Sequence, residues 1–150
     1  MSKIHHFLFA ALIAGVGCVG SPAVALDDTF FAILNGGNEV SDSGQANAGD
    51  PNGYGSASVV FVAPNRFCYS IIVNNIGNPT AAHIHRGAAG VNGRIVVTLI
   101  APNVGNPGLS RGCEVVGDAL AEAIRNHPQR FYVNVHTGAF PGGAVRGQLF

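Results

Sequence analysis

The feature that most constrains the fold of this chain is a series of short runs rich in β-branched and aromatic residues, each bounded by Gly, Asn or Pro. Such runs are typical of strands in a turn-rich β protein, and the 21 glycines and 8 prolines fit that interpretation. We predict strands near residues 29–35, 54–63, 66–75, 80–86, 93–100, 130–136 and 143–149.

The segments between these runs define the connections. The sequence Ala63-Pro-Asn-Arg66 predicts a turn, so the runs on either side of it should form an antiparallel hairpin. The polar, Gly-rich stretch 35–53 predicts a long surface loop. No period of roughly 20 to 50 residues repeats along the chain, which argues against a solenoid or a propeller. We therefore expect an all-β domain built as a two-sheet antiparallel sandwich with Greek-key connections.

One segment departs from the β pattern. Residues 118–126 combine an acidic start, Ala-rich helix-forming residues and a following Pro128, which together predict one short helix. Leu120 and Ile124 are four positions apart, so both should face the core.

The first 25 residues are typical of a signal peptide. Lys3 precedes an apolar run over 7–19, and Ala23-Val-Ala25 places small residues where a signal peptidase cleaves, which predicts cleavage before Leu26. The run is short for a membrane span, although an uncleaved anchor remains an alternative. A lipoprotein modified at Cys18 is a second alternative. We expect one mature domain, residues 26–150, that is periplasmic or secreted.

The charge of the expected mature chain excludes two classes of partner. Cleavage removes the single lysine and leaves 7 arginines against 8 acidic residues, a net charge of about −1. A nearly neutral chain without a basic cluster has no strong electrostatic attraction to nucleic acid or to an anionic membrane. Neither partner is expected after the signal peptide is removed.

Two cysteines remain in the expected mature chain, Cys68 and Cys113. In an exported protein they are most simply interpreted as one disulfide, and closing a loop of this length contributes roughly 4 kcal/mol on the chain-entropy model. Two buried free thiols are the alternative, because spacing alone does not show that their Cα atoms lie close together.

Three histidines form the candidate functional site. His83 and His85 are two positions apart on a predicted strand, so both side chains leave the same face, about 7 Å apart along the backbone. If the strand that ends at His136 lies beside them, three neutral imidazoles would form an open site for copper or zinc. Alternatively, the histidines hold the loops 87–93 and 137–143 through hydrogen bonds to backbone carbonyls.

The sequence offers little for catalysis by other routes. No Ser of the expected mature chain lies in a G-x-S-x-G turn, and the acidic residues show no paired spacing. The glycine-rich stretch 87–93 lies between two predicted strands, whereas a phosphate-binding loop leads from a strand into a helix. We predict no catalytic residues and no organic cofactor, and we expect a protein that is not an enzyme.

Four segments together resemble the chordin-type (CHRD) domain family of secreted proteins. They are Leu34-Asn-Gly-Gly-Asn-Glu-Val40, Ala81-Ala-His-Ile-His-Arg-Gly-Ala-Ala-Gly-Val-Asn-Gly93, Tyr132-Val-Asn-Val-His-Thr137 and Pro141-Gly-Gly-Ala-Val-Arg-Gly-Gln-Leu149, within a match over about residues 29–150. The resemblance implies an immunoglobulin-like β-sandwich.

The family motifs also suggest a contact. Glu39 and Arg146 belong to the motifs at the two ends of the domain, and we predict a salt bridge between them that joins the first and last strands. The His-x-His strand with a later His is similar to Cu/Zn superoxide dismutase. The expected mature chain has too few histidines for the full dismutase site, so dismutase activity is not expected.

Two hypotheses about function follow. The first is a non-enzymatic binding or structural module whose loops after His85 and His136 contact an unidentified protein or glycan. The second is a periplasmic metal-binding protein that holds copper or zinc with His83, His85 and His136. A metal-dependent redox enzyme would require the second hypothesis to hold first.

Overall fold

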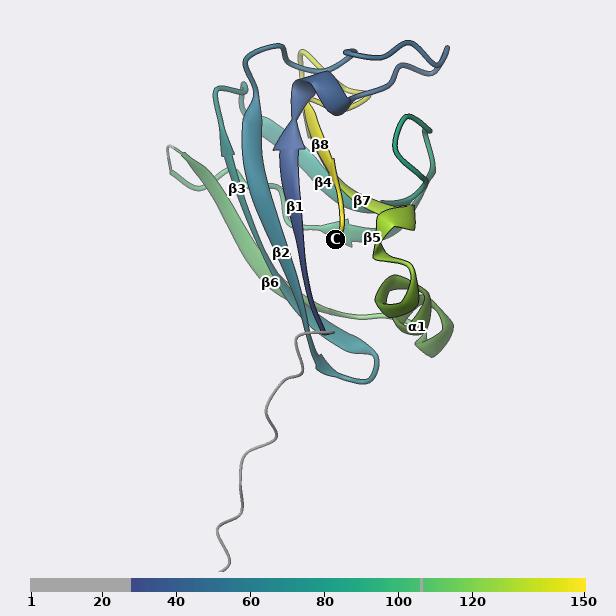
Figure 1. Cartoon of the computed structure of the whole chain (residues 1–150). Helices are drawn as coiled ribbons and strands as arrows, with labels where there is room; N and C mark the ends of the chain where they lie inside the picture. Colours follow the sequence, from purple (N-terminus) through teal and green to yellow (C-terminus); the bar gives the residue numbers. More distant parts are fainter. Residues whose placement is uncertain (1–27, 106) are drawn as a thin grey trace, which may run out of the picture.

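The computed structural model of the chain describes residues 28–105 and 107–150, so the predicted signal peptide and its cleavage point lie outside the described residues. The described part contains eight strands and one α-helix (Figure 1). Their bounds are β1 (Thr29–Asn35), β2 (Tyr54–Ala63), β3 (Arg66–Asn74), β4 (Pro79–Arg86), β5 (Arg94–Leu99), β6 (Gly108–Val115), α1 (Asp118–Asn126), β7 (Phe131–Thr137) and β8 (Val145–Gln148). Two short 3₁₀ helices, η2 (Gly36–Asn38) and η3 (Pro128–Arg130), lie between them.

All eight strands belong to one antiparallel sheet, in the order β5-β4-β7-β8-β1-β2-β3-β6. Its two halves meet where the first strand lies beside the last. Asn35 of β1 is opposite Arg146 of β8, and the backbones of Phe31 and Phe150 exchange two hydrogen bonds of 3.0 Å. The sheet curls so strongly that it is nearly barrel-shaped, as Figure 1 shows.

The prediction of an all-β antiparallel fold is confirmed, whereas the finer prediction of a two-sheet Greek-key sandwich is not. In a sandwich the two sheets contact each other through side chains. Here the backbone pairing of β1 with β8 makes both halves parts of one sheet. The patterns of the individual strands did not reveal this pairing, because it joins segments more than 100 residues apart in the chain; only the predicted contact between Glu39 and Arg146 related the first strand to the last.

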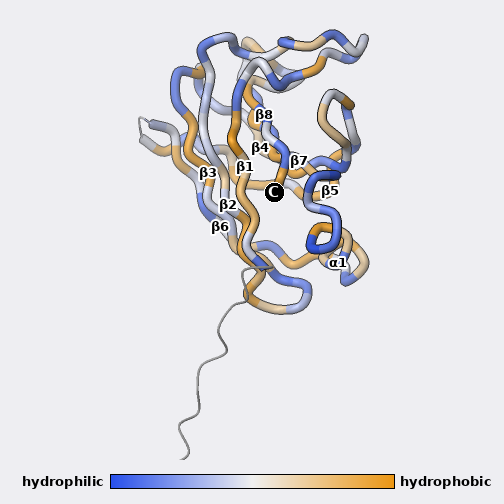
Figure 2. Tube along the Cα trace, in the orientation of Figure 1, coloured by the Kyte–Doolittle hydropathy of each residue, from blue (hydrophilic) through white to orange (hydrophobic). Residues whose placement is uncertain are grey.

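The concave face of the sheet encloses the hydrophobic core. Its central members are fully buried side chains from strands of both halves, among them Leu34, Phe67, Ile84 and Val133. Figure 2 shows hydrophobic residues concentrated along the strands and hydrophilic ones in the connecting loops. Alternation of buried and exposed positions along β1 and β3 gives each strand one core face.

The predicted helix is confirmed with the same bounds, Asp118–Asn126. Ala121 and Ile124 are fully buried in the core, and Leu120 packs against it while partly exposed. Within residues 28–105 and 107–150, no helix is long and apolar enough to cross a membrane.

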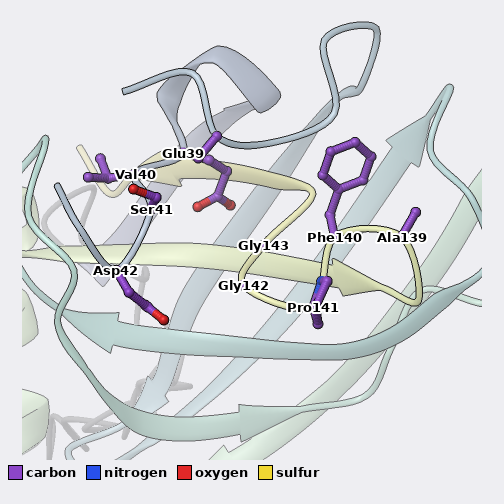
Figure 3. A pocket seen from close by; sticks show the side chains of 10 residues that line it. Glu39, Val40, Ser41, Asp42, Ala139, Phe140, Pro141, Gly142 and Gly143 are labelled. Atoms are coloured by element: carbon purple, nitrogen blue, oxygen red, sulfur yellow. The ribbon is translucent and has the colours of Figure 1, made fainter. Parts of the chain in front are cut away.

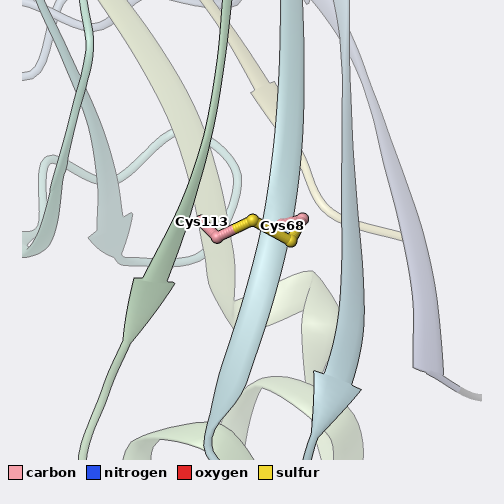
Figure 4. Close-up of a disulfide and its surroundings, with 2 residues drawn as sticks. All are labelled: Cys68 and Cys113. Atoms are coloured by element: carbon pink, nitrogen blue, oxygen red, sulfur yellow. A yellow bond between two sulfur atoms is a disulfide. The ribbon is translucent and has the colours of Figure 1, made fainter.

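Strand β6 was missed in the sequence analysis. Its sequence, Gly108-Leu-Ser-Arg-Gly-Cys-Glu-Val115, contains two glycines and few β-branched residues, so its strand propensity is weak. Pairing along β3 determines its conformation, and Cys113 lies directly opposite Cys68 in that pairing. The predicted disulfide between these two residues is confirmed, with an S–S distance of 2.05 Å (Figure 4).

Because the disulfide connects residues 45 positions apart, it should restrict the unfolded chain strongly. We predict that replacing both cysteines, Cys68→Ala with Cys113→Ala, lowers the free energy of unfolding by about 4 kcal/mol in urea titrations. Ser70→Ala, on the same face of β3, serves as the control and should have a much smaller effect. A loss below about 1 kcal/mol for the double variant would contradict the prediction.

Candidate metal centre

Strand β7 is buried on both of its faces, as is the first part of its neighbour β8. Phe131, Val133 and Val135 enter the core, whereas Tyr132 and Asn134 point to the opposite face and are still only 1% and 2% exposed. The strand register places polar side chains of neighbouring strands on that same opposite face. We call this set the outer polar layer; it consists of Glu39, His83, His85, Tyr132, Asn134, His136, Arg146 and Gln148.

Loops cover the outer polar layer and exclude water from most of it. Asn92, in the loop after β4, donates a hydrogen bond of 2.8 Å to the carbonyl of Val40 in the loop after β1. The backbone N–H of Asp50 donates one of 2.8 Å to the carbonyl of Ala144, just before β8. Three loops that are distant in sequence are thereby joined above one patch of the sheet.

The three predicted histidines come together in this layer. His83 and His85 leave the same face of β4, as the sequence predicted, with ring centroids 5.5 Å apart. Strand β7 lies beside β4 and places the His136 ring 4.9 Å from that of His83 and 6.1 Å from that of His85. Each imidazole offers one ring nitrogen to a common space, and the three nitrogens lie within 4.8 Å of one another.

Hydrogen bonds to backbone carbonyls orient two of the rings. His85 Nδ1 lies 2.9 Å from the carbonyl oxygen of Gly93, and His136 Nδ1 lies 2.9 Å from that of Pro141. A carbonyl only accepts, so both Nδ1 atoms carry the proton and both Nε2 atoms keep a lone pair. The histidines therefore hold the two loops, as the structural alternative predicted, while their Nε2 atoms stay available as ligands.

The third ring completes the cluster. His83 Nδ1 lies 3.0 Å from His136 Nε2, so one proton is shared between the two rings. His83 is partly exposed, and no hydrogen bond to a backbone group holds it among those found in residues 28–105 and 107–150. A metal ion bound to both nitrogens would replace this hydrogen bond, and His83 would then carry its proton on Nε2.

Burial keeps the cluster neutral. It lowers the pKa of His83 from 6.5 to about 4, with further lowering by the neighbouring His136 and His85. Burial also lowers the pKa of His85 and of His136, although the hydrogen bonds to Gly93 and Pro141 oppose this shift. Neutral imidazole is the form that binds metal ions, so the cluster has the correct protonation state at neutral pH.

A stack of three side chains supports His85. Its ring lies on that of Tyr132 with centroids 4.8 Å apart and planes only 10° from parallel. The guanidinium of Arg146 lies over the other side of Tyr132, 3.6 Å from the ring centroid. Tyr132 also accepts a hydrogen bond of 3.1 Å from the backbone N–H of Gly93, the residue that orients His85.

The predicted salt bridge between Glu39 and Arg146 is not formed in the described part of the chain. Arg146 donates instead to the carbonyls of Ala88 and Val91, at 3.1 and 3.0 Å, and to the side-chain oxygen of Asn92 at 3.3 Å. The loop after β4 therefore supplies the oxygens that the guanidinium needs. Both predicted residues are nevertheless 1% exposed and belong to the same layer.

Glu39 lies at the base of a groove of about 250 Å³ between the loop after β1 and the turn 139–143 (Figure 3). Burial raises its pKa from 4.5 to about 7, against the opposing effects of Arg146, the Val40 backbone and the Asn134 amide. Its Oε1 has no hydrogen-bond partner. Gly143 has φ +143°, and a Cβ there would overlap this carboxyl group, so glycine leaves the space that Glu39 fills.

Tyr132 and Asn134 were not predicted from the sequence as members of the site. The signal was present in the strand sequence Tyr-Val-Asn-Val-His, whose alternation places Tyr132, Asn134 and His136 on one face. It was overlooked because polar residues facing away from a core are normally exposed.

Together, the fold and the outer polar layer define a disulfide-linked, all-β domain with a partly buried imidazole cluster. The CHRD domain family matches residues 30–149, nearly the whole chain. The chain belongs to this family, and the resemblance seen in the sequence is confirmed. No curated protein matched the chain.

The raised pKa of Glu39 leads to a pH-dependent prediction. The folded state binds this proton more tightly than the unfolded state, so the associated stability is present below pH 4.5 and is lost as the pH rises through about 7. Since glutamine does not ionise, Glu39→Gln should gain stability relative to wild type over this range, by about 3 kcal/mol in total.

The measurement is urea unfolding of both proteins at pH 5 and pH 8, with Glu122→Gln on the exposed side of α1 as the control for the same chemical change. If the difference between Glu39→Gln and wild type were the same at both pH values, Glu39 would not titrate as described.

Proposed function

We propose that this CHRD domain is an exported, non-enzymatic module that binds one copper or zinc ion through His83, His85 and His136. The observation that carries the proposal is the convergence of three neutral ring nitrogens within 4.8 Å. Two nitrogens bound to one ion at about 2.1 Å are roughly 3 to 3.4 Å apart. The His83–His136 pair, at 3.0 Å, has this spacing already, and a small movement of the His85 ring completes it.

The buried polar atoms of the layer support a cation as the occupant. Four of its buried side-chain atoms have no hydrogen-bond partner: Glu39 Oε1, His85 Nε2, Asn134 Oδ1 and Gln148 Oε1. Each of these atoms has an electron pair to donate. For His85 Nε2 this follows because the ring carries its proton on Nδ1, toward the Gly93 carbonyl. Leaving such atoms unpaired costs free energy, which a Lewis acid in the layer would reduce.

The arrangement around the rings favours copper or zinc. Imidazole nitrogen is a preferred ligand of both metals, and the three-imidazole set leaves a coordination position open. The carbonyls of Gly93 and Pro141 hold the Nδ1 protons, which is the usual support for histidine ligands. Binding rather than catalysis is proposed because the neighbouring side chains Tyr132 and Arg146 are engaged in packing and hydrogen bonds.

Export is supported by the disulfide between Cys68 and Cys113, which is characteristic of oxidising compartments. The amino-terminal pattern of residues 1–25 supports the same conclusion from the sequence alone. We therefore propose that the metal is bound in the periplasm or outside the cell.

The test is metal content and unfolding of the purified protein with and without Cu²⁺ or Zn²⁺. At an ion concentration about 100 times the dissociation constant, the free energy of unfolding should rise by about 2.7 kcal/mol. The double variant His83→Ala with His136→Ala should lose this increase. His127→Ala, an exposed histidine at the end of α1, is the matched control and should keep it.

Stoichiometric binding by wild type and His127→Ala, together with no binding by the double variant, would support the proposal. If no ion binds to wild type, or if the double variant responds to the ion as wild type does, the proposal is wrong.

A further inference from the structure

Asn134 occupies the centre of the outer polar layer. On one side it pairs with His83 of β4, and on the other with Arg146 of β8. His136 lies two residues further along the same strand and therefore on the same face. Asn134 is 2% exposed, and its Oδ1 is buried without a hydrogen-bond partner. An orphaned oxygen beside two converging imidazoles needs an explanation.

Glu39 determines which end of this amide faces the histidines. A Cβ at Gly143 would overlap both Glu39 Oε1 and Asn134 Nδ2, so the carboxyl oxygen and the amide nitrogen lie against the same backbone position. A carboxyl oxygen of Glu39 accepts hydrogen bonds, so the N–H groups of the Asn134 amide are favoured on the side that faces Glu39. The opposite branch of the amide, Oδ1, is consequently directed away from Glu39.

Glu39 is not itself a member of the converging group. The His, Cys, Asp and Glu side chains of the described residues that come together as possible metal ligands are His83, His85 and His136. An effect of Glu39 on the cluster would therefore pass through Asn134, which lies between them in the layer. This arrangement makes Glu39 a positioning residue and makes Asn134 the layer's unpaired side-chain oxygen on the strand next to His83.

We propose that Asn134 Oδ1 is the fourth ligand of the ion held by His83, His85 and His136, an inference that rests on the proposed function. Three imidazole nitrogens and one amide oxygen form an N₃O set. Amide oxygens serve as weak ligands beside imidazoles in known copper sites. Such a set favours Cu²⁺ or Zn²⁺ over Cu⁺, because thiolate and thioether ligands are the ones that select Cu⁺.

The test compares Cu²⁺ affinity and the electron paramagnetic resonance spectrum of the copper-loaded protein in three variants. Asn134→Ala removes the oxygen and should weaken binding by about tenfold while changing the copper hyperfine splitting. Asn134→Asp keeps an oxygen at the same position and adds negative charge, so it should bind at least as tightly as wild type. Ser110→Ala is the control, because Ser110 Oγ is also buried and unpaired but lies on β6, opposite Ile71 of β3.

Thermal melting of the metal-free variants distinguishes a loss of folding from a loss of ligation. Asn134→Asp and Asn134→Ala both remove the native amide, but only Asn134→Asp retains an oxygen. Weak binding by Asn134→Ala and strong binding by Asn134→Asp would support the assignment. If Asn134→Ala keeps the affinity and spectrum of wild type, Asn134 is not a ligand, and the three-histidine site stands without it.

If Asn134→Ala weakens binding but leaves the spectrum unchanged, the residue affects binding without being a ligand, which overturns direct ligation. A wild-type protein that binds no ion would overturn both this inference and the proposed function.

Discussion

A buried guanidinium must find oxygen acceptors for its N–H groups, and much of the outer polar layer follows from how Arg146 does so. The loop after β4 supplies the carbonyls of Ala88 and Val91, which fixes that loop over the sheet. The same loop carries Gly93, whose carbonyl orients His85. Tyr132 packs against both Arg146 and His85, so the position of the arginine side chain constrains that of the His85 ring. The orientation of a possible metal ligand thus depends on an arginine of a different strand.

The two faces of β7 are stabilised in different ways. Its core face contributes apolar area, which tolerates small shifts of the side chains. Its other face is a network of directional contacts in which each polar atom needs a specific partner. Several acceptors in that network have none, and one of them is the Nε2 atom of His85 in the imidazole cluster. In the function that we propose, a bound cation would pair with such acceptors and stabilise the layer, which relates the energetics of the fold to that function.

Local sequence signals predicted the local structure well. The helix was identified because its acidic start, Ala-rich body and following proline all agree, and the disulfide was identified from two cysteines in a chain expected to be exported. Strand β6 was missed because tertiary pairing, and not propensity, makes it a strand. The three histidines were found from their spacing, but Asn134 was not, because its role depends on loops that cover the sheet. The joining of β1 with β8 leaves no local pattern at all.

The pairing of β1 with β8 affects the order in which the domain can fold. The first strand of the domain cannot complete its pairing until the last strand is available, since β8 provides one of the two neighbours of β1. Closure of the sheet therefore waits for residues at the carboxyl end, and such non-local pairing is slow. In the export that we propose, a domain whose sheet closes only when β8 is available stays unfolded long enough to pass through a translocation pore, which a domain that folds early would block.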